Sequence, residues 1–88
     1  MAEILTRNEE ILWRLIEDKV VILDMDEARA IMLNEVGSHI WIALQTQKTT
    51  EELVCQVIDV FNTDEESARK DVLSFLNDMI KRDLIKVG

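Results

Sequence analysis

The sequence has no proline, no tyrosine, two glycines and one cysteine. A single cysteine, Cys55, cannot form an intramolecular disulfide, and together with the single histidine, His39, it supplies too few ligands for a structural zinc site. Two isolated glycines, Gly37 and Gly88, cannot build a glycine-rich loop that cradles a phosphate group. These absences argue against a disulfide scaffold, a zinc domain and a phosphate-binding loop.

Basic residues are also scarce, because 10 Lys and Arg stand against 18 Asp and Glu, giving a net charge of −8. Proteins bind nucleic acid largely through Lys and Arg side chains that displace counterions from the phosphates. We therefore expect neither nucleic acid nor an anionic membrane as a partner. The apolar runs are too short to span a bilayer and the N-terminus lacks a secretion signal, which predicts a cytoplasmic protein.

Hydrophobic residues make up 48% of the chain and charged residues 32%, which is the balance of a folded globular protein. A length of 88 residues suffices for one core, and no linker or repeat interrupts the chain. We expect a single domain over residues 1–88 in which residues 1–10 are frayed.

Residues 11–34 show the alternation of side chains that is typical of β-strands. The pattern predicts strands at 11–16, 20–25 and 28–33, with polar turns at 17–19 and 24–28. In the third of these strands, successive side chains point to opposite faces, with Arg29, Ile31 and Leu33 on one face and Ala30 and Met32 on the other. Short turns between successive strands predict an antiparallel meander.

From Asn34 onward the apolar residues recur at helical spacing. The side chain of Asn34 is suited to cap the start of a first helix. Thr49 and Glu52 have the spacing of a capping box, which predicts a second helix at 50–61.

A third helix begins within 62–67, where either Thr63 with Glu66 or Asp64 alone is the cap. Residues 83–85 then leave this helix and return the chain to the sheet. The order βββααα predicts an α+β fold, in which a three-stranded antiparallel meander is followed by three helices in a winged-helix-like arrangement.

No set of side chains has the composition of a catalytic site. His39 lies beside the apolar stripe of the first predicted helix, where an exposed or partly packed histidine is the simpler interpretation than a general base, which needs a nucleophile and an orienting carboxylate held close to it. Cys55 flanks an apolar stripe, where a lone cysteine usually acts as a small hydrophobe. The acidic clusters fall at turns and helix starts, where they serve as caps and solubilising charge. We expect a protein that is not an enzyme and that holds no cofactor and no metal.

The strand at 28–33 is the candidate for a binding surface. It ends the meander, and an edge strand presents main-chain groups that can pair with another strand. The third helix adds a broad apolar arc, which includes Leu73, Phe75 and Met79. A strand edge beside a helix is the geometry that captures an extended peptide. The simpler alternative is a short strand that contributes only to the core.

Three segments in order resemble the PqqD-like family: "LNEVGSHIW" (33–41), "TTEELV" (49–54) and "DEESARKDVLSFLNDMIKRDLI" (64–85). The resemblance covers roughly residues 11–85. It implies that the fold-defining residues are Leu33, Asn34, Gly37, Ile40, Trp41, Asp71, Val72, Phe75 and Leu76. Two positions depart from the family pattern, because Asp83 stands where glycine is usual and Met79 where leucine is common.

The resemblance also implies a function, that of a RiPP recognition element. Such a domain binds the leader of a ribosomally made precursor peptide, as an extra strand on the third strand and against the third helix. It then presents the precursor to a maturation enzyme such as a radical SAM protein, a leader peptidase or a cyclase. We therefore predict a non-catalytic peptide chaperone.

Residues and resemblance together predict a peptide-binding set made of Ala28, Arg29, Ala30, Ile31, Met32, Leu33, Arg69, Val72, Leu73 and Leu76. The leader would pair antiparallel to the strand, and small alanines would let it lie close. Arg29 and Arg69 are either contacts for leader carboxylates or solvated surface charges, and Val72 and Leu76 are either groove wall or core. A proline at Ile31 would weaken binding, provided that its N–H points outward.

The main competing interpretation is a winged-helix DNA-binding regulator. It is disfavoured because the second helix, 50–61, contains no Lys or Arg, whereas a recognition helix carries them along one face. A third interpretation is a homodimer in which the open strand pairs with a second copy of the chain.

Overall fold

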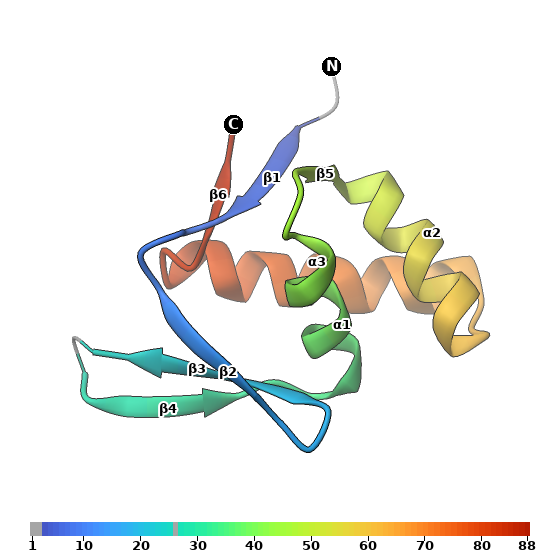
Figure 1. Ribbon diagram of the computed structural model, residues 1–88. Coiled ribbons are helices and arrows are strands. Elements are labelled where there is room, and N and C mark those ends of the chain that lie inside the picture. The colour runs from blue at the N-terminus through green and yellow to red at the C-terminus, as the bar shows by residue number, and fades with distance from the viewer. Residues whose placement is uncertain (1–2, 26) are drawn as a thin grey trace.

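The computed structural model describes residues 3–25 and 27–88, so Met1, Ala2 and Asp26 lie outside it, the last of them within the predicted turn at 24–28. The described part contains six strands and three helices, in the order β1 (Ile4–Arg7), β2 (Leu12–Ile16), β3 (Lys19–Asp24), β4 (Arg29–Met32), α1 (Glu35–Ala43), β5 (Lys48–Thr49), α2 (Thr50–Phe61), α3 (Glu65–Lys81) and β6 (Ile85–Val87) (Figure 1). This α+β architecture confirms the predicted fold class. No helix in the described ranges has the length and apolar character to cross a membrane.

One sheet is the predicted meander, with the strand order β2-β3-β4, and we call it the meander sheet. A tight turn joins β2 to β3, since Ile16 pairs with Lys19 and the two residues between them, Glu17 and Asp18, have φ angles of 50° and 69°. Positive φ at both central residues is the conformation whose twist suits a two-residue hairpin. β3 then pairs antiparallel with β4, from Val21 with Met32 to Asp24 with Arg29.

A second sheet was not predicted, and we call it the terminal sheet. Its order is β5-β1-β6, so it joins three segments that lie far apart in the sequence (Figure 1). Residues 4–7, expected to be frayed, instead pair with β5 on one side and with β6 on the other, and Leu5 is only 1% exposed. The segment after α3 does return to a sheet, but it pairs with β1 rather than with the meander.

The helix caps follow the predicted chemistry. Asn34 caps α1, its Oδ1 accepting from the N–H of Gly37 at 2.8 Å. Thr49 and Glu52 form the capping box of α2, which spans the predicted residues. Of the two alternatives for α3 the structure selects Asp64, whose Oδ1 accepts from the N–H of Ser67 at 2.7 Å.

The core lies between the three helices and the inner face of the meander sheet. Side chains from β1, β3, α1, α2 and α3 fill it, and Trp41 is fully buried among them. The guanidinium of Arg7 lies 5.1 Å from the ring centre of Trp13 and 5.6 Å from that of Trp41. Because these rings belong to β2 and α1, this cation–π contact ties β1 to the meander sheet and to the first helix.

Candidate functional site

The outer edge of β4 is open. Leu33 N donates to Val20 O at 2.9 Å, so Leu33 belongs to the hydrogen-bonded positions of the β3–β4 pair. These positions alternate along an antiparallel pair, so Ile31 also bonds to β3, whereas the N–H and C=O groups of Ala30 and Met32 point away from it. Within the described residues no strand pairs with β4 on that side. A foreign strand would find its partners at Ala30 and Met32.

The prediction for a proline at Ile31 required an N–H that points away from the sheet, and this N–H does not. Its N–H faces Ile22 on β3, with which it is paired in the sheet. A proline at this position would remove a bond of the meander itself rather than one offered to a ligand. The informative proline position is Ala30.

The end of β4 is fastened to α1 by one hydroxyl group. Ser38 Oγ accepts from the N–H of Val20 at 2.9 Å and donates to the C=O of Leu33 at 3.3 Å, and Ser38 is only 3% exposed. The hydroxyl is inserted where the β3–β4 ladder ends and fixes α1 against the strand. The sequence analysis did not predict a role for Ser38. The pattern that could have indicated one is a small polar residue placed between Gly37 and the apolar Ile40 and Trp41.

A groove runs beside this edge, along one side of α3. One hollow of about 490 Å³ is lined by Asn34, Val36, Gly37, Asp71, Ser74, Phe75 and Asp78. A second hollow of about 420 Å³ is lined by Asp24, Glu27, Arg29, Asp78, Lys81 and Arg82. The two share Asp78, and they reach Arg29, the first residue of β4, and Asn34, two residues after its end. We call the combined feature the β4–α3 groove.

The floor of the groove is apolar at the α1 end, where Gly37 lets Phe75 approach the helix. A Cβ atom at position 37 would lie 2.9 Å from Phe75 Cε1 and 3.2 Å from the capping oxygen of Asn34. No such contact is sterically tolerable without movement, so any other residue here would displace the ring or the cap. Together with Val36, the half-buried Phe75 forms a shallow apolar floor.

The rims of the groove are charged. Asp71 and Asp78 stand on α3 at the α1 end, whereas Lys81 and Arg82 lie toward the other end. Arg82 Nε lies 3.1 Å from Asp78 Oδ1, which places an exposed ion pair along the α3 side of the groove. Exposed pairs of this kind contribute little to stability and can exchange one partner for a charge on a ligand.

On the β4 side, the predicted site residues divide into four groups. Arg29 lines the groove and pairs with Glu27 at 2.8 Å. Ala30 and Met32 are exposed and carry the outward main-chain groups, while Ile31 is half-buried and Leu33 buried, so their side chains belong to the core. Ala28 lies in the turn with a φ of 50° and not on the strand.

On α3 the predicted groove wall is displaced from the observed one. Val72 and Leu76 are 0% and 3% exposed, which makes them core. Leu73 is exposed, but it stands two positions from Phe75, roughly 200° around the helix, and therefore projects to the opposite side. The wall consists instead of Asp71, Ser74, Phe75 and Asp78.

Arg69 also lies outside the groove. Its guanidinium donates to Glu51 of α2 at 2.6 Å and to Glu65 at 3.1 Å. The hydrogen bond from Arg69 lowers the pKa of Glu51 below its usual value, and the two carboxylates raise the pKa of Arg69. The side chain is thus engaged in a network between α2 and α3, away from β4.

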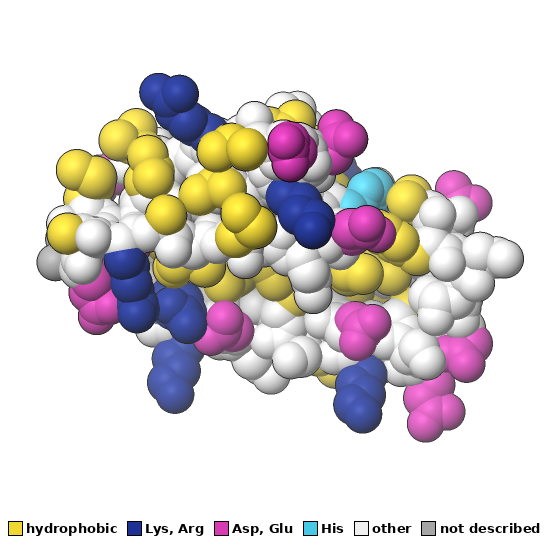
Figure 2. Space-filling model, turned by 90° about the horizontal axis from the view of Figure 1, so that it is seen from below, with side chains coloured by type: hydrophobic (Ala, Val, Ile, Leu, Met, Phe, Trp, Pro, Cys, Tyr) yellow, Lys and Arg dark blue, Asp and Glu magenta, His cyan; other side chains and the backbone are white. Residues whose placement is uncertain are grey.

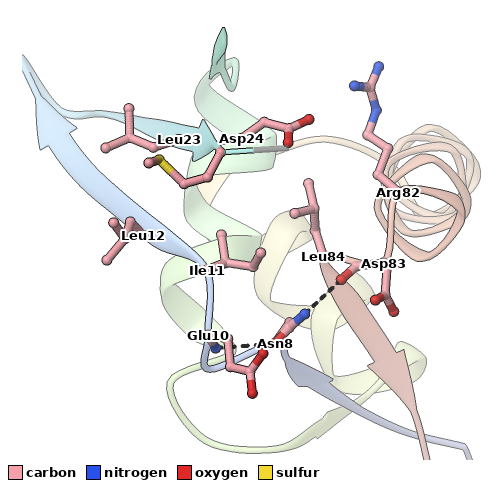
Figure 3. Close-up of a pocket in the computed structure, with 10 residues that line it drawn as sticks. Asn8, Glu10, Ile11, Leu12, Leu23, Asp24, Arg82, Asp83 and Leu84 are labelled. Atoms are coloured by element: carbon pink, nitrogen blue, oxygen red, sulfur yellow. Dashed lines mark hydrogen bonds between the residues drawn. The ribbon is translucent and has the colours of Figure 1, made fainter. Parts of the chain in front are cut away.

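A third hollow, of about 280 Å³, lies where the chain passes from β1 into β2 (Figure 3). Its lining includes Asn8, whose Nδ2 donates to the C=O of Asp83 at 3.0 Å and whose Oδ1 accepts from the N–H of Glu10 at 3.1 Å. These bonds join the β1–β2 connection to the end of α3. The hollow has no histidine or nucleophile in its lining and is a structural joint.

The two residues considered for catalysis lie elsewhere and apart from other reactive groups. The ring of His39 meets Phe61 edge to face with centroids 5.8 Å apart, and Cys55 is exposed on α2. Among the described residues, no cluster of three or more His, Cys, Asp or Glu could hold a metal ion.

Comparisons with known proteins agree with this geometry. Residues 19–85 match the family model described as "Coenzyme PQQ synthesis protein D (PqqD)". The fold is similar to that of TbiB1 solved in complex with the TbiA(beta) leader peptide, with a TM-score of 0.80 and 26% identity over 92% of this chain and 94% of that chain. No curated protein matches the chain.

A second solved structure has the same fold at lower identity. It is the solution NMR structure of the PqqD truncation of Methylobacterium extorquens PqqCD, which represents a functional and stand-alone RiPP recognition element. Its TM-score is 0.75, with 14% identity over 94% of this chain and 88% of that chain. At this identity the similarity is one of fold.

Proposed function

The chain belongs to the PqqD family, and on this premise we propose that it is a RiPP recognition element that binds the leader of a precursor peptide and presents it to a maturation enzyme. The observation that carries the proposal is the open edge of β4 beside the β4–α3 groove. The TbiB1 structure, which contains a leader peptide, supports it from a similar fold.

The leader adds a strand antiparallel to β4. Its main chain pairs with the N–H and C=O groups of Ala30 and Met32, and alternate side chains of the leader enter the groove. Small and flexible side chains at these two positions leave room for the added strand. Affinity comes from the main-chain bonds, and selectivity comes from the groove.

The lining of the groove defines the kind of leader that fits. An apolar leader side chain rests on Phe75 and Val36, and a basic side chain beside it meets Asp71 and Asp78. Nearer the start of β4, Arg29 is placed to receive a leader carboxylate in exchange for Glu27. These residues replace Arg69, Val72, Leu73 and Leu76 in the proposed binding set.

The protein acts without catalysis of its own and in the cytoplasm. Its enzymatic partner is of the type that modifies or cleaves a precursor, such as a radical SAM protein, a leader peptidase or a cyclase. A DNA-binding regulator is less well supported, because α2 carries Glu51, Glu52 and Asp59 and no Lys or Arg that could meet phosphates.

Proline substitutions at the two edges of the meander sheet test the proposal. The Ile16–Lys19 pair closes the hairpin, so by alternation the N–H of Leu15 on β2 also points outward. Ala30→Pro should weaken binding of a synthetic leader at least about tenfold, because it removes an outward donor of β4. Leu15→Pro is the matched control at the opposite edge and should leave the affinity unchanged.

Amide NMR shifts during the leader titration provide the second measurement. Changes should concentrate at residues 29–34 and along the groove side of α3, from Asp71 to Asp78. Unchanged affinity of Ala30→Pro, together with shifts confined to α2, would show that the leader binds elsewhere.

A further inference from the structure

The meander sheet has a second face, which turns away from the helices and is largely apolar. Strand register arranges its side chains in three rows, Leu12 with Leu23 and Ala30, Arg14 with Val21 and Met32, and Ile16 with Lys19. These eight residues define the outer face. Figure 2, which views the molecule from below, shows hydrophobic side chains gathered over this sheet.

The outer face is not needed to close the core. Core contacts of the meander sheet come from the opposite face, through Trp13, Val20, Ile22 and Ile31. On the outer face, Leu12 is 57% exposed, Ile16 49% and Met32 65%. An antiparallel sheet with one solvated face normally carries polar residues there, and a contiguous exposed apolar patch marks an interaction surface.

We propose that the outer face docks a folded protein whose matching surface is apolar and bordered by carboxylates. Resting on the proposed function, this partner is the maturation enzyme itself. The charge of the face supports this choice, because it carries Arg14 and Lys19 and no Asp or Glu, although the whole chain has a net charge of −8. Complementary carboxylates would orient the partner.

Two other occupants fit the charges less well. A second copy docked through the same face would bring basic residues to both sides of the contact, with no carboxylate on either face to meet them. An anionic membrane would attract Arg14 and Lys19, but it would repel the excess of acidic residues in the rest of the chain.

The position of the outer face links enzyme docking to leader binding. A leader strand added to β4 would continue the sheet, so its outward side chains would extend the row that runs through Val21 and Met32. An enzyme seated on the outer face would then contact this chain and the leader together. We expect the leader to increase the affinity for the enzyme, and the enzyme to increase that for the leader by the same factor.

Two variants on β2, the strand farthest from β4, separate the two surfaces. The double variant Leu12→Thr/Ile16→Thr removes apolar area while keeping residues that favour strands, and Arg14→Glu reverses one charge. The matched control, Val60→Thr, alters an exposed apolar residue of α2 (54% exposed). The probe is the purified maturation enzyme that acts on the leader-bearing precursor, titrated with and without the leader.

Both β2 variants should weaken enzyme binding about tenfold or more while changing leader affinity less than about twofold, and Val60→Thr should change neither. Wild-type enzyme affinity in both β2 variants would overturn the inference. So would sedimentation showing a dimer that the double variant abolishes, or binding to anionic phosphatidylserine vesicles that Arg14→Glu abolishes. If the wild type does not bind the leader at all, the proposed function is refuted. The two failures can be told apart because enzyme binding is also measured without the leader.

Discussion

The two sheets of the molecule are both three-stranded and antiparallel, yet they differ in how they are assembled. The meander sheet comes from one continuous segment, residues 12–32, and within the described residues the outer edge of β4 has no partner strand and lies along a groove. The terminal sheet gathers residues 4–7, 48–49 and 85–87, and its two edge strands have two and three residues. Very short edges offer little to a foreign strand. Closure of the fold and capture of a ligand are thus assigned to different sheets.

The terminal sheet acts as the clasp of the fold. Ile4 and Gly88 exchange main-chain hydrogen bonds at 3.3 and 2.8 Å, which join the two ends of the chain. Arg7 extends this connection to the indole rings of β2 and α1. If this division of roles is correct, damage to the terminal sheet should lower stability, whereas damage to the edge of β4 should lower affinity.

The largest effect is expected from Leu5→Ala in β1. Leu5 is 1% exposed within the core, so its truncation should lower the free energy of unfolding by about 2–5 kcal/mol. Its neighbour Ile4 is 39% exposed, and Ile4→Ala should cost well under half as much. Urea titration measures both. At temperatures where Leu5→Ala remains folded, its leader affinity should match that of the wild type. A loss of affinity as large as the loss of stability would contradict the assignment of stability and binding to different sheets.

A smaller effect is expected at the junction of the meander sheet with α1. Ser38→Ala leaves the N–H of Val20 and the C=O of Leu33 without the bridging hydroxyl, which should cost about 1–3 kcal/mol. Ser74→Ala, at an exposed position of α3, is the control and should be nearly neutral for stability. Because Ser38 holds the end of β4, its loss should also speed hydrogen exchange of the Leu33 amide. Protection equal to that of the wild type would mean that the strand end is held by other contacts.

The same contrast explains what could be predicted from the sequence. Alternation and short turns are local signals, so the three strands of the meander and their order were predicted correctly. Capping depends on residues three positions apart, so the starts of α1 and α2 could also be predicted from the sequence. The terminal sheet escaped prediction because strands of two to four residues have no measurable period, and their pairing partners lie at the far ends of the chain.

The residues of the groove wall could not be predicted for a different reason. An apolar pattern along α3 identifies the stripe that is buried, and Val72 and Leu76 are indeed core. The wall that faces β4 is the flank of that stripe, where Asp71 and Asp78 look like ordinary solvated charges in the sequence. Only the placement of α3 beside β4 gives them a candidate role.

Asp83 links α3 to the last strand of the terminal sheet, and its replacement should stabilise that sheet. Asp83 has a φ of 61°, and the N–H groups of Asp83 and Leu84 donate to the C=O groups of Ile80 and Met79, at 3.0 and 2.9 Å. This is the helix ending that glycine favours, which accounts for glycine at the corresponding position of the family pattern.

Asp83→Gly should therefore raise the free energy of unfolding by about 1 kcal/mol, since it removes the steric cost of a left-handed residue. Arg82→Gly is the matched control, because Arg82 has a φ of −87° and gains nothing from glycine. Thermal unfolding compares the two variants. A less stable Asp83→Gly protein would indicate that the carboxylate makes a contribution larger than the strain.

The smallest effect is a dependence on pH that should concern the caps at the starts of α2 and α3. Backbone hydrogen bonds at the helix starts lower the pKa of Glu52, which bonds to Thr49 of β5, and the pKa of Asp64, which bonds to Ser67, below their usual 4.5 and 3.8. A carboxyl group whose pKa is lower in the folded state stabilises the fold above its unfolded pKa. That contribution disappears as the pH falls through the folded value, so it should be complete at pH 6 and lost on acidification from about pH 4.5 downward.

The variant Glu52→Gln/Asp64→Asn, which keeps polar caps but cannot titrate, should therefore lose less melting temperature between pH 6 and pH 3 than the wild type. Glu9→Gln/Asp59→Asn is the control of equal charge, placed outside the caps. Leader binding by the open edge of β4 depends on main-chain groups that do not titrate, so the added strand should persist over the range in which the caps weaken. An identical loss of melting temperature in the cap variant and the wild type would show that the acid sensitivity originates elsewhere than at the starts of α2 and α3.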